Sequence, residues 1–186
     1  MMKIILASKS PRRKQLLEQA GVLFEVITVE TDEDFPADIA IENVPVFIAE
    51  QKAVSVAALY PDRIVVAADT IVTIDNEVIG KPADEVDAAA ILRKLSGRVH
   101  RVITGVSIFY EGKKENFYEE TEVEFDVLND EQIYFYINNF RPYDKAGAYA
   151  IQEWIGLTGI KKINGNYYNV MGLPVNRVLK ILKQLQ

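Results

Sequence analysis

The first residues whose types suggest chemistry are two serines and three cations in residues 8–13, SKSPRR. They follow an apolar run, residues 3–7, that has the length of a strand. Ser10 is a favourable N-cap and Pro11 suits the first helical position, so the sequence predicts a strand, a tight loop and a helix that begins with arginines. Unpaired backbone N–H groups, the positive end of the helix dipole and guanidinium groups together form an anion site, and phosphate fits it best. The alternative is that the two arginines lie on a solvated face.

Carboxylates that could act with this anion site occur at two places. Residues 63–68 are very apolar and predict a buried strand that ends in Asp69 and Thr70. A carboxylate at that end of a strand lies where α/β sheets place their ligands, although Asp69 could instead cap the next turn. Residues 30–38 form an acidic loop, which is commonly just solvated, but one of its carboxylates could hold a cation beside the phosphates. Lys52, taken by itself, is a surface lysine of a helix.

The residue composition and the motifs of the chain exclude several other types of site. The single histidine, His100, excludes a multi-histidine metal site, and the absence of cysteine excludes disulfides and thiolate sites. Neither the G-x-S-x-G nucleophile motif nor the phosphate-binding G-x-x-x-x-G-K-[ST] loop occurs. Cations and carboxylates remain, and this set suits metal-assisted hydrolysis of a phosphoanhydride, in which a carboxylate activates water.

Bulk composition narrows the class of protein. The 186 residues are 49% hydrophobic and 26% charged, which suits one domain, or two joined lobes, with an ordinary core. A net charge of −6 argues against non-specific binding of nucleic acid or of an anionic membrane as the main activity. No apolar run approaches the roughly 18 residues of a membrane span, and no secretory signal pattern is found, so we expect a cytoplasmic protein.

Hydrophobic periodicity predicts alternating strands and helices early in the chain and antiparallel strands later. Further strands are expected at residues 24–29 and 71–74, and further helices at 44–60, 84–95 and 130–140 and after Pro174. Long strands at residues 99–110 and 116–128 predict a hairpin, and residues 160–170 a second hairpin that turns at Asn164-Gly165. Core positions are expected in two of the helices, at Phe47, Ile48, Val54, Ala57, Ala58, Ile133, Tyr134 and Ile137. We therefore predict a mixed α/β fold, with an elongated twisted sheet flanked by helices and a central cleft between two lobes.

The sequence resembles the Maf family of nucleoside triphosphate pyrophosphatases over essentially its whole length. Any one of the matching motifs is weak, but their ordered set is specific. The set comprises Ser8 to Arg13, Asp32-Glu33, Lys52-Ala53, Ala68-Asp69-Thr70, Gly80-Lys81-Pro82, Ser96-Gly97 with His100, Thr104-Gly105, Asp144 to Tyr149 with Gln152, Asn169-Val170 and Gly172-Leu173-Pro174. The resemblance implies a single Maf-like domain over residues 1–186, similar in fold to the inosine triphosphate pyrophosphatases.

The resemblance also implies a reaction and roles for particular residues. The reaction is cleavage between the α and β phosphates of a nucleotide, with a divalent cation, Mg²⁺ or Mn²⁺. Asp69 matches the family's proton acceptor. Asp69 and Glu33 match carboxylates that would bind the metal ion. The positions associated with substrate choice are Arg12, Thr70 and Gln152. The phosphate-contacting positions are Ser8, Arg13, Lys52 and Lys81.

The form of the motif around Gln152 resembles the subgroup that acts on dTTP and UTP. Its amide offers the donor and the acceptor that a pyrimidine imide edge requires. Gln51 departs from the acidic residue that is common before the matching lysine, which weakens a metal role for that helix. Two alternatives stay open: a broader house-cleaning pyrophosphatase for modified nucleotides, and a non-enzymatic, nucleotide-sensing regulator of septum formation. A homodimer is expected only at the level of the family.

Overall fold

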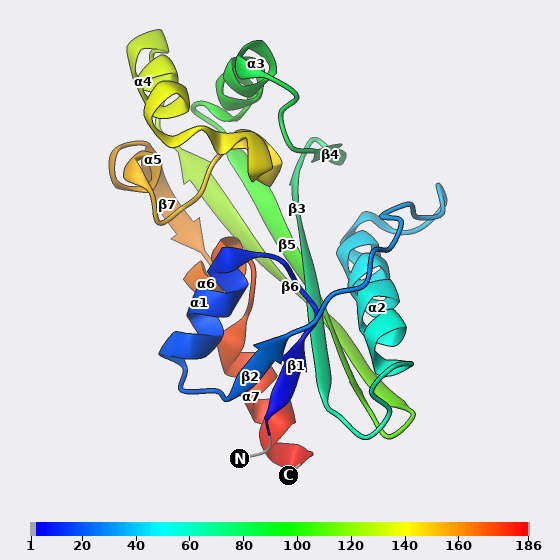
Figure 1. Ribbon diagram of the computed structural model, residues 1–186. Helices are drawn as coiled ribbons and strands as arrows, with labels where there is room; N and C mark the ends of the chain where they lie inside the picture. The colour runs from blue at the N-terminus through cyan, green and yellow to red at the C-terminus, as the bar shows by residue number, and fades with distance from the viewer. Residues whose placement is uncertain (1–2, 186) are drawn as a thin grey trace. The chain divides into compact units, whose positions relative to one another are not determined.

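The computed structural model describes residues 3–185, and its sheet is built from seven strands (Figure 1). The strands are β1 Ile4–Leu6, β2 Phe24–Val26, β3 Val65–Ile74, β4 Glu77–Ile79, β5 Val99–Tyr110, β6 Lys113–Phe125 and β7 Ile160–Asn164. The α-helices are α1 Pro11–Gln19, α2 Val44–Ala57, α3 Glu85–Leu95, α4 Asp130–Phe140, α5 Trp154–Thr158, α6 Tyr167–Met171 and α7 Val175–Gln184. The short 3-10 helices are η1 Ile41–Asn43, η2 Pro142–Asp144 and η3 Ala146–Ala148.

The sheet mixes parallel and antiparallel pairs. Its strand order is β2-β1-β3-β5-β6-β7, and β4 also pairs with β3. β1 is parallel to both β2 and β3, whereas β4 is antiparallel to β3 and β7 is antiparallel to β6. Two-residue turns with positive φ at both positions, Asp75-Asn76 and Glu111-Gly112, connect β3 to β4 and β5 to β6, as the right-handed twist of hairpin strands favours. This confirms the predicted mixed α/β fold with helices flanking a mixed twisted sheet.

The described chain divides into two compact units, which we treat separately. The first unit comprises residues 3–69, 104–119 and 172–185, and the second comprises residues 70–103 and 120–171. The boundaries cross the long strands β3, β5 and β6, so each of these strands contributes to both units. The single domain over residues 1–186 and the cleft between lobes stay predictions.

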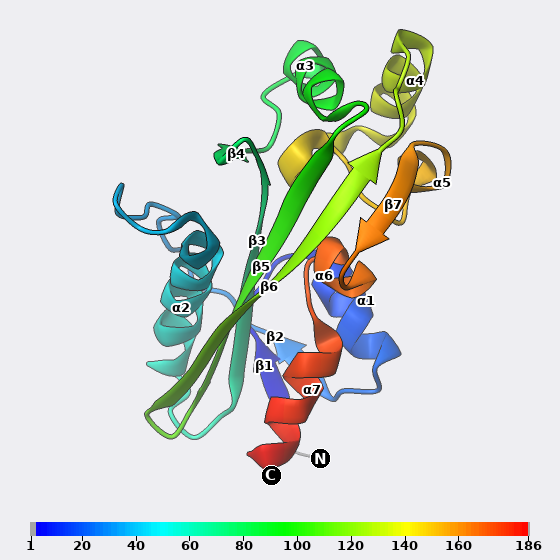
Figure 2. The ribbon, with the colours of Figure 1, turned by 180° about the vertical axis from the view of Figure 1, so that it is seen from behind.

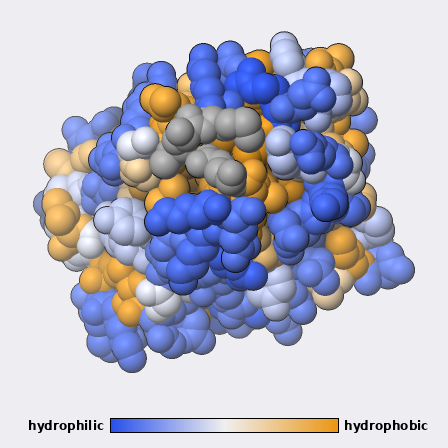
Figure 3. Space-filling view, turned by 90° about the horizontal axis from the view of Figure 1, so that it is seen from below, coloured by the Kyte–Doolittle hydropathy of each residue, from blue (hydrophilic) through white to orange (hydrophobic). Residues whose placement is uncertain are grey.

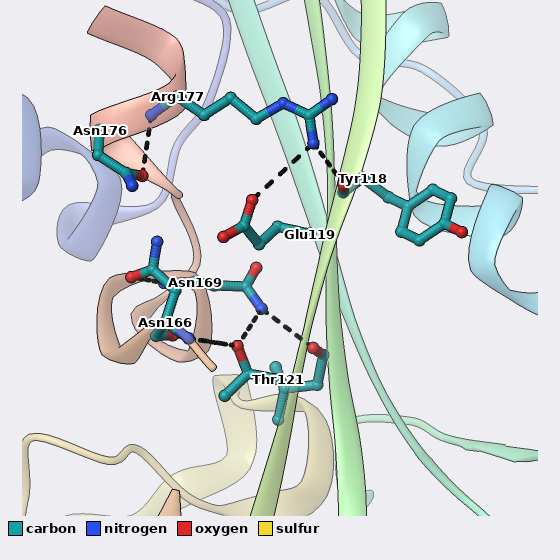
Figure 4. A network of polar contacts seen from close by, with 8 residues as sticks. Tyr118, Glu119, Thr121, Asn166, Asn169, Asn176 and Arg177 are labelled. Atoms are coloured by element: carbon teal, nitrogen blue, oxygen red, sulfur yellow. Dashed lines mark hydrogen bonds and ion pairs between the residues drawn. The ribbon is translucent and has the colours of Figure 1, made fainter. Parts of the chain in front are cut away.

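In the first unit, helices cover both faces of the strands. α2 lies on one face, and α1 and α7 lie on the other (Figures 1 and 2). Strand alternation explains this arrangement, because successive side chains point to opposite faces. The core beneath α2 consists of Ile5, Ala7, Ala53, Val56, Ala57, Val65 and Ala67, all buried. Arg177 of α7 adds an exposed contact, because its guanidinium donates to Tyr118 O at 3.0 Å (Figure 4). The same guanidinium lies over the Phe117 ring, 4.0 Å from its centroid.

In the second unit, side chains fix the starts of the two largest helices. Asp84 accepts a hydrogen bond from Asp87 N at the start of α3, and Asn129 and Gln132 form a capping box at the start of α4. α3 and α4 contact each other. Asn169 of α6 is fully buried and donates to Thr121 Oγ1 at 2.9 Å and to Val102 O at 3.1 Å (Figure 4). The Asn169 motif therefore has a structural explanation within this unit.

Four sequence expectations are corrected. Val54 and Ala58 are exposed, and Ala53 and Val56 take the core positions of α2. Tyr134 is 38% exposed rather than part of the core, whereas Tyr136 is fully buried. The second hairpin is absent from residues 160–170, because β7 ends at Asn164 and α6 begins at Tyr167. Asp69 lies inside β3 rather than at its end, because the strand continues through Thr70 to Ile74.

Polar side chains make up much of the visible surface. On the face shown in Figure 3, hydrophobic residues lie in several groups separated by hydrophilic ones. Among residues 3–185, no helix combines the length and the apolar character needed to cross a membrane.

Candidate active site

Three elements of the first unit bring one cation and two carboxylates together. Lys52 of α2 places its Nζ atom 2.9 Å from Asp69 Oδ1 and 2.8 Å from Glu33 Oε1. Asp69 comes from β3, and Glu33 from the segment that follows β2. The Lys52 and Asp69 side chains are largely buried, at 18% and 16% exposure, whereas that of Glu33 is 55% exposed. Lys52 is therefore an integral part of a charged cluster rather than a solvated surface lysine.

Contacts at the start of α2 and along its length hold Lys52 in this place. A side chain at Gly105 of β5 would put its Cβ atom only 2.2 Å from Pro45 C and Val46 N, so only glycine lets β5 approach the first turn of α2 this closely. Glu50, two residues before Lys52, binds Lys114 and Asn116 of β6. The sequence placed Gly105 in a motif but did not show why a glycine is needed at this position.

The arginines at the start of α1 differ in their surroundings. Arg13 is 9% exposed, and it donates from Nε to Gly172 O at 2.8 Å and from Nη1 to Ser8 Oγ at 3.0 Å. Ser8 Oγ also accepts from Ser10 N at 3.3 Å, which leaves the Ser8 hydroxyl hydrogen as a donor for a ligand. Arg12 is only partly buried. Arg13 thus lies beneath the loop and holds Ser8 in place. The alternative of a solvated face is therefore excluded for Arg13.

The charges of the two groups act on each other. Burial lowers the pKa of the Arg13 guanidinium from its ordinary value, and Asp69 partly offsets this effect by raising it. Arg12 lowers the same pKa further, and Glu33 raises it. The carboxylates of Asp69 and Glu33 are therefore near enough to Arg13 to act on its charge.

A cavity of about 860 Å³ opens beside this cluster. Its lining includes Ser8, Lys9, Glu33, Gln51 and Lys52, all within the first unit. Gln51 Oε1 is buried and has no hydrogen-bond partner among the described residues. This volume lies within the range of small-molecule sites.

The two carboxylates fit a divalent cation that arrives with phosphates. Among residues 3–185, no group of three or more histidine, cysteine, aspartate or glutamate side chains is arranged to hold a metal ion. Mg²⁺ is commonly held by only one or two carboxylates together with substrate phosphates and water. Asp69 and Glu33 already converge on one point, where a positive charge is accommodated.

The remaining predicted site residues, Thr70, Lys81 and Gln152, belong to the second unit. Lys81 and Gln152 are exposed, and Thr70 is partly buried. Gly147 N donates to Gly80 O at 3.1 Å, which connects the loop of Lys81 to the segment that leads to Gln152. A side chain at Gly147 would meet Val72, and its φ of 71° favours glycine. Gly147 therefore lets this segment pack closely against the Val72 side chain.

Comparison with known families covers nearly the whole chain. The family described as Maf-like protein matches residues 3–185.

The chain belongs to the Maf family.

Individual Maf relatives are similar over nearly the whole of this chain. The dTTP/UTP pyrophosphatase of Cytophaga hutchinsonii is 49% identical over 182 residues, which cover 98% of this chain and 84% of that protein. The dTTP/UTP pyrophosphatase of Phocaeicola vulgatus is 49% identical over 185 residues, which cover 98% of this chain and 96% of that protein. Among solved structures, the Ham1 protein of Staphylococcus aureus has a TM-score of 0.47 and 14% identity, over 67% of this chain and 72% of that one. That structural likeness is too low to establish a shared fold.

Two buried aromatic residues of this Maf protein support its second unit, and the sequence analysis assigned a role to neither of them. Tyr136 bonds the segment around Gln152, and Tyr149 Oη lies 2.7 Å from Nε2 of the buried His100. The i, i+3 spacing of Ile133 and Tyr136 on α4 is a signal that would have placed Tyr136 in the core.

Proposed function

We propose that this protein is a nucleoside triphosphate pyrophosphatase that hydrolyses dTTP and UTP to the monophosphate and pyrophosphate. The proposal rests on the cluster of Lys52, Asp69 and Glu33 beside the cavity. The positive charge of Arg13 interacts with both carboxylates of this cluster. A triphosphate needs fixed cations, and water attack on it needs a base. The names of the Maf relatives agree with both requirements.

Asp69 is the group that we assign as proton acceptor. Water attacks the α phosphorus, its proton passes to the Asp69 carboxylate, and the bond from the α phosphorus to the bridging oxygen breaks, which releases pyrophosphate. Lys52, Ser8 and the arginines neutralise or donate to the phosphate oxygens, and Lys81 is assigned the same function. A divalent cation held by Asp69, Glu33 and the phosphates would supply further neutralisation of negative charge.

Base choice is assigned to Gln152, together with Arg12 and Thr70. The carboxamide of Gln152 has both a donor and an acceptor, which match the O and N–H of the imide edge of thymine and uracil. Cytosine presents an amino group and a bare ring nitrogen at the same positions. A glutamine that is oriented by its surroundings can therefore distinguish the two kinds of base. A cytoplasmic location and a homodimer are further proposals from the sequence.

The test is a pyrophosphate-release assay with dTTP, UTP, CTP and 7-methyl-GTP in Mg²⁺ or Mn²⁺, run on the wild type and on Asp69→Asn. We expect Asp69→Asn to lose about two to four orders of magnitude in rate, the range for a general base. The matched control is Asp62→Asn, which changes an exposed carboxylate outside the cavity and is expected to leave the rate unchanged.

Three outcomes contradict parts of the proposal. A near-normal rate for Asp69→Asn removes the assignment of Asp69. Comparable release from modified nucleotides replaces dTTP and UTP with a broader house-cleaning range. Tight binding of nucleotide without any pyrophosphate release points to the nucleotide-sensing regulator.

A further inference from the structure

The backbone around Gln152 forms a tight turn in the second unit. Glu153 N donates to Ala150 O at 3.1 Å, so residues 150–153 form a β-turn with Gln152 at its third position. Ala150 and Ile151 are buried, at 6% and 5% exposure, whereas Gln152 is exposed. Gln152 is thus the one exposed residue of the turn, since Glu153 is partly buried.

A single buried hydroxyl bonds both ends of this turn. Tyr136 Oη accepts a hydrogen bond from Ala150 N at 3.0 Å and donates to Glu153 Oε2. The Tyr136 side chain is fully buried, and its ring stacks on Phe140 with the ring centroids 5.1 Å apart. Because packing fixes the ring, the hydroxyl is a rigid reference point for the residues before and after Gln152.

We propose that Tyr136 is a positioning residue for base selection, which acts by holding the turn that carries Gln152. The inference rests on the proposed function, because it deepens the assignment of Gln152. A base-reading amide discriminates only while its donor and acceptor stay in register with the base edge. Loss of the Tyr136 hydroxyl leaves the buried Ala150 N–H without this acceptor, and the turn then relaxes to satisfy it.

Other contacts keep the segment folded when the hydroxyl is removed. Lys145 Nζ lies 3.6 Å from Glu153 Oε1 and 2.7 Å from Asp144 Oδ1. Gly147 N remains bonded to Gly80 O, and Tyr149 remains bonded to His100. Removal of one oxygen is therefore expected to loosen the turn without unfolding the unit.

The experiment compares Tyr136→Phe with Tyr134→Phe. Both variants lose one phenolic oxygen from α4, but the Tyr134 hydroxyl lies at the surface, 3.3 Å from Arg93 Nη2. We measure kcat and KM for dTTP, UTP and CTP with the full-length protein. We expect Tyr136→Phe to narrow the preference for dTTP over CTP about five- to tenfold, the factor for one hydrogen bond, mainly through KM. Tyr134→Phe should leave the preference unchanged.

A double-mutant cycle separates positioning from general destabilisation. If Tyr136 acts through Gln152, Tyr136→Phe has no further effect on the preference in a Gln152→Ala background. Trp154, the only tryptophan in the sequence, packs against Phe135 next to the turn, with the ring centroids 4.6 Å apart. Its fluorescence therefore reports independently on the same backbone. Its emission should shift in Tyr136→Phe and not in Tyr134→Phe.

Each outcome decides the inference. Equal loss of rate on all nucleotides, or additive effects in the cycle, overturns it. If Tyr136→Phe does not fold, Glu153→Ala removes the other end of the same contact, and an unchanged preference there overturns it as well. If the wild type releases no pyrophosphate, the proposed function is overturned. If the wild type is active but Tyr136→Phe keeps the same preference for dTTP over CTP, this inference alone is overturned.

Discussion

The Lys52 ammonium lies 2.9 Å from the carboxylate of Asp69, the residue assigned as the base. Glu33 approaches the same ammonium at 2.8 Å, so a cation of the chain itself occupies the point on which both carboxylates converge. Without this charge, the two carboxylates would repel each other. A bound divalent cation must therefore compete with Lys52, and a bound triphosphate offers Lys52 another anionic partner.

Replacement of Lys52 by methionine removes that competition at similar side-chain length. In Lys52→Met we expect Mn²⁺ to bind the nucleotide-free protein about three- to tenfold more tightly, the factor for roughly 1 kcal/mol between partly exposed charges. The KM for dTTP should rise, because one phosphate partner is lost. Titration calorimetry with Mn²⁺ measures the first effect without any turnover.

The control for this variant is Lys161→Met, which removes an exposed lysine paired with Glu124 on β6. It should leave both Mn²⁺ affinity and KM unchanged. Equal Mn²⁺ affinity in Lys52→Met and the wild type would show that the ammonium and the metal do not compete for the two carboxylates.

Gly105 is expected to tolerate no side chain. Its added Cβ would meet the backbone of Pro45 and Val46 at 2.2 Å, and backbone cannot rotate away. Gly105→Ala should destabilise the protein by about 3 kcal/mol, as overpacking does, and lower activity because α2 carries Lys52. Urea unfolding measures the stability change. Gly80→Ala is the control for stability, since nothing lies within 4 Å of its Cβ position; similar losses in the two variants would contradict the steric explanation.

His100 predicts a specific loss of stability in acid. Burial lowers its pKa from 6.5 to about 4, and Nδ1 has no hydrogen-bond partner among the described residues. The unfolded chain binds a proton below pH 6.5, whereas the folded protein does so only below about pH 4. Stability should therefore fall by up to about 1.4 kcal/mol per pH unit from 6.5 down to 4, in addition to any carboxylate effects.

The variant His100→Gln isolates this contribution. Its free energy of unfolding, measured in denaturant at several pH values, should be lower at neutral pH, because contacts with Tyr149 and Phe125 are lost. Its slope between pH 6.5 and 4 should be shallower than that of the wild type. Parallel slopes would mean that His100 does not remain neutral in the folded protein.

Several elements could be predicted because their signals are local. Ser10 and Pro11 take the N-cap and first helical positions of α1, Asp84 caps α3, and alternation predicted β5. The ordered motifs predicted the family. The residues that differed are those for which local signals compete: Asn164-Gly165 has the composition of a hairpin turn, but a helix follows it, and Asp69 interrupts an apolar run without ending the strand.

The sequence by itself determined the strand, loop and helix that begin the chain, the mixed α/β class and the kinds of residue available for catalysis, because these depend on neighbouring residues and on composition. Only the tertiary structure decided that Lys52 joins Asp69 and Glu33, that Arg13 is buried against Ser8, and that Tyr136 holds the turn at Gln152. These contacts join residues 5 to 19 positions apart in the chain, and for most of them the partner is set by how helices pack on strands. No local preference encodes that packing.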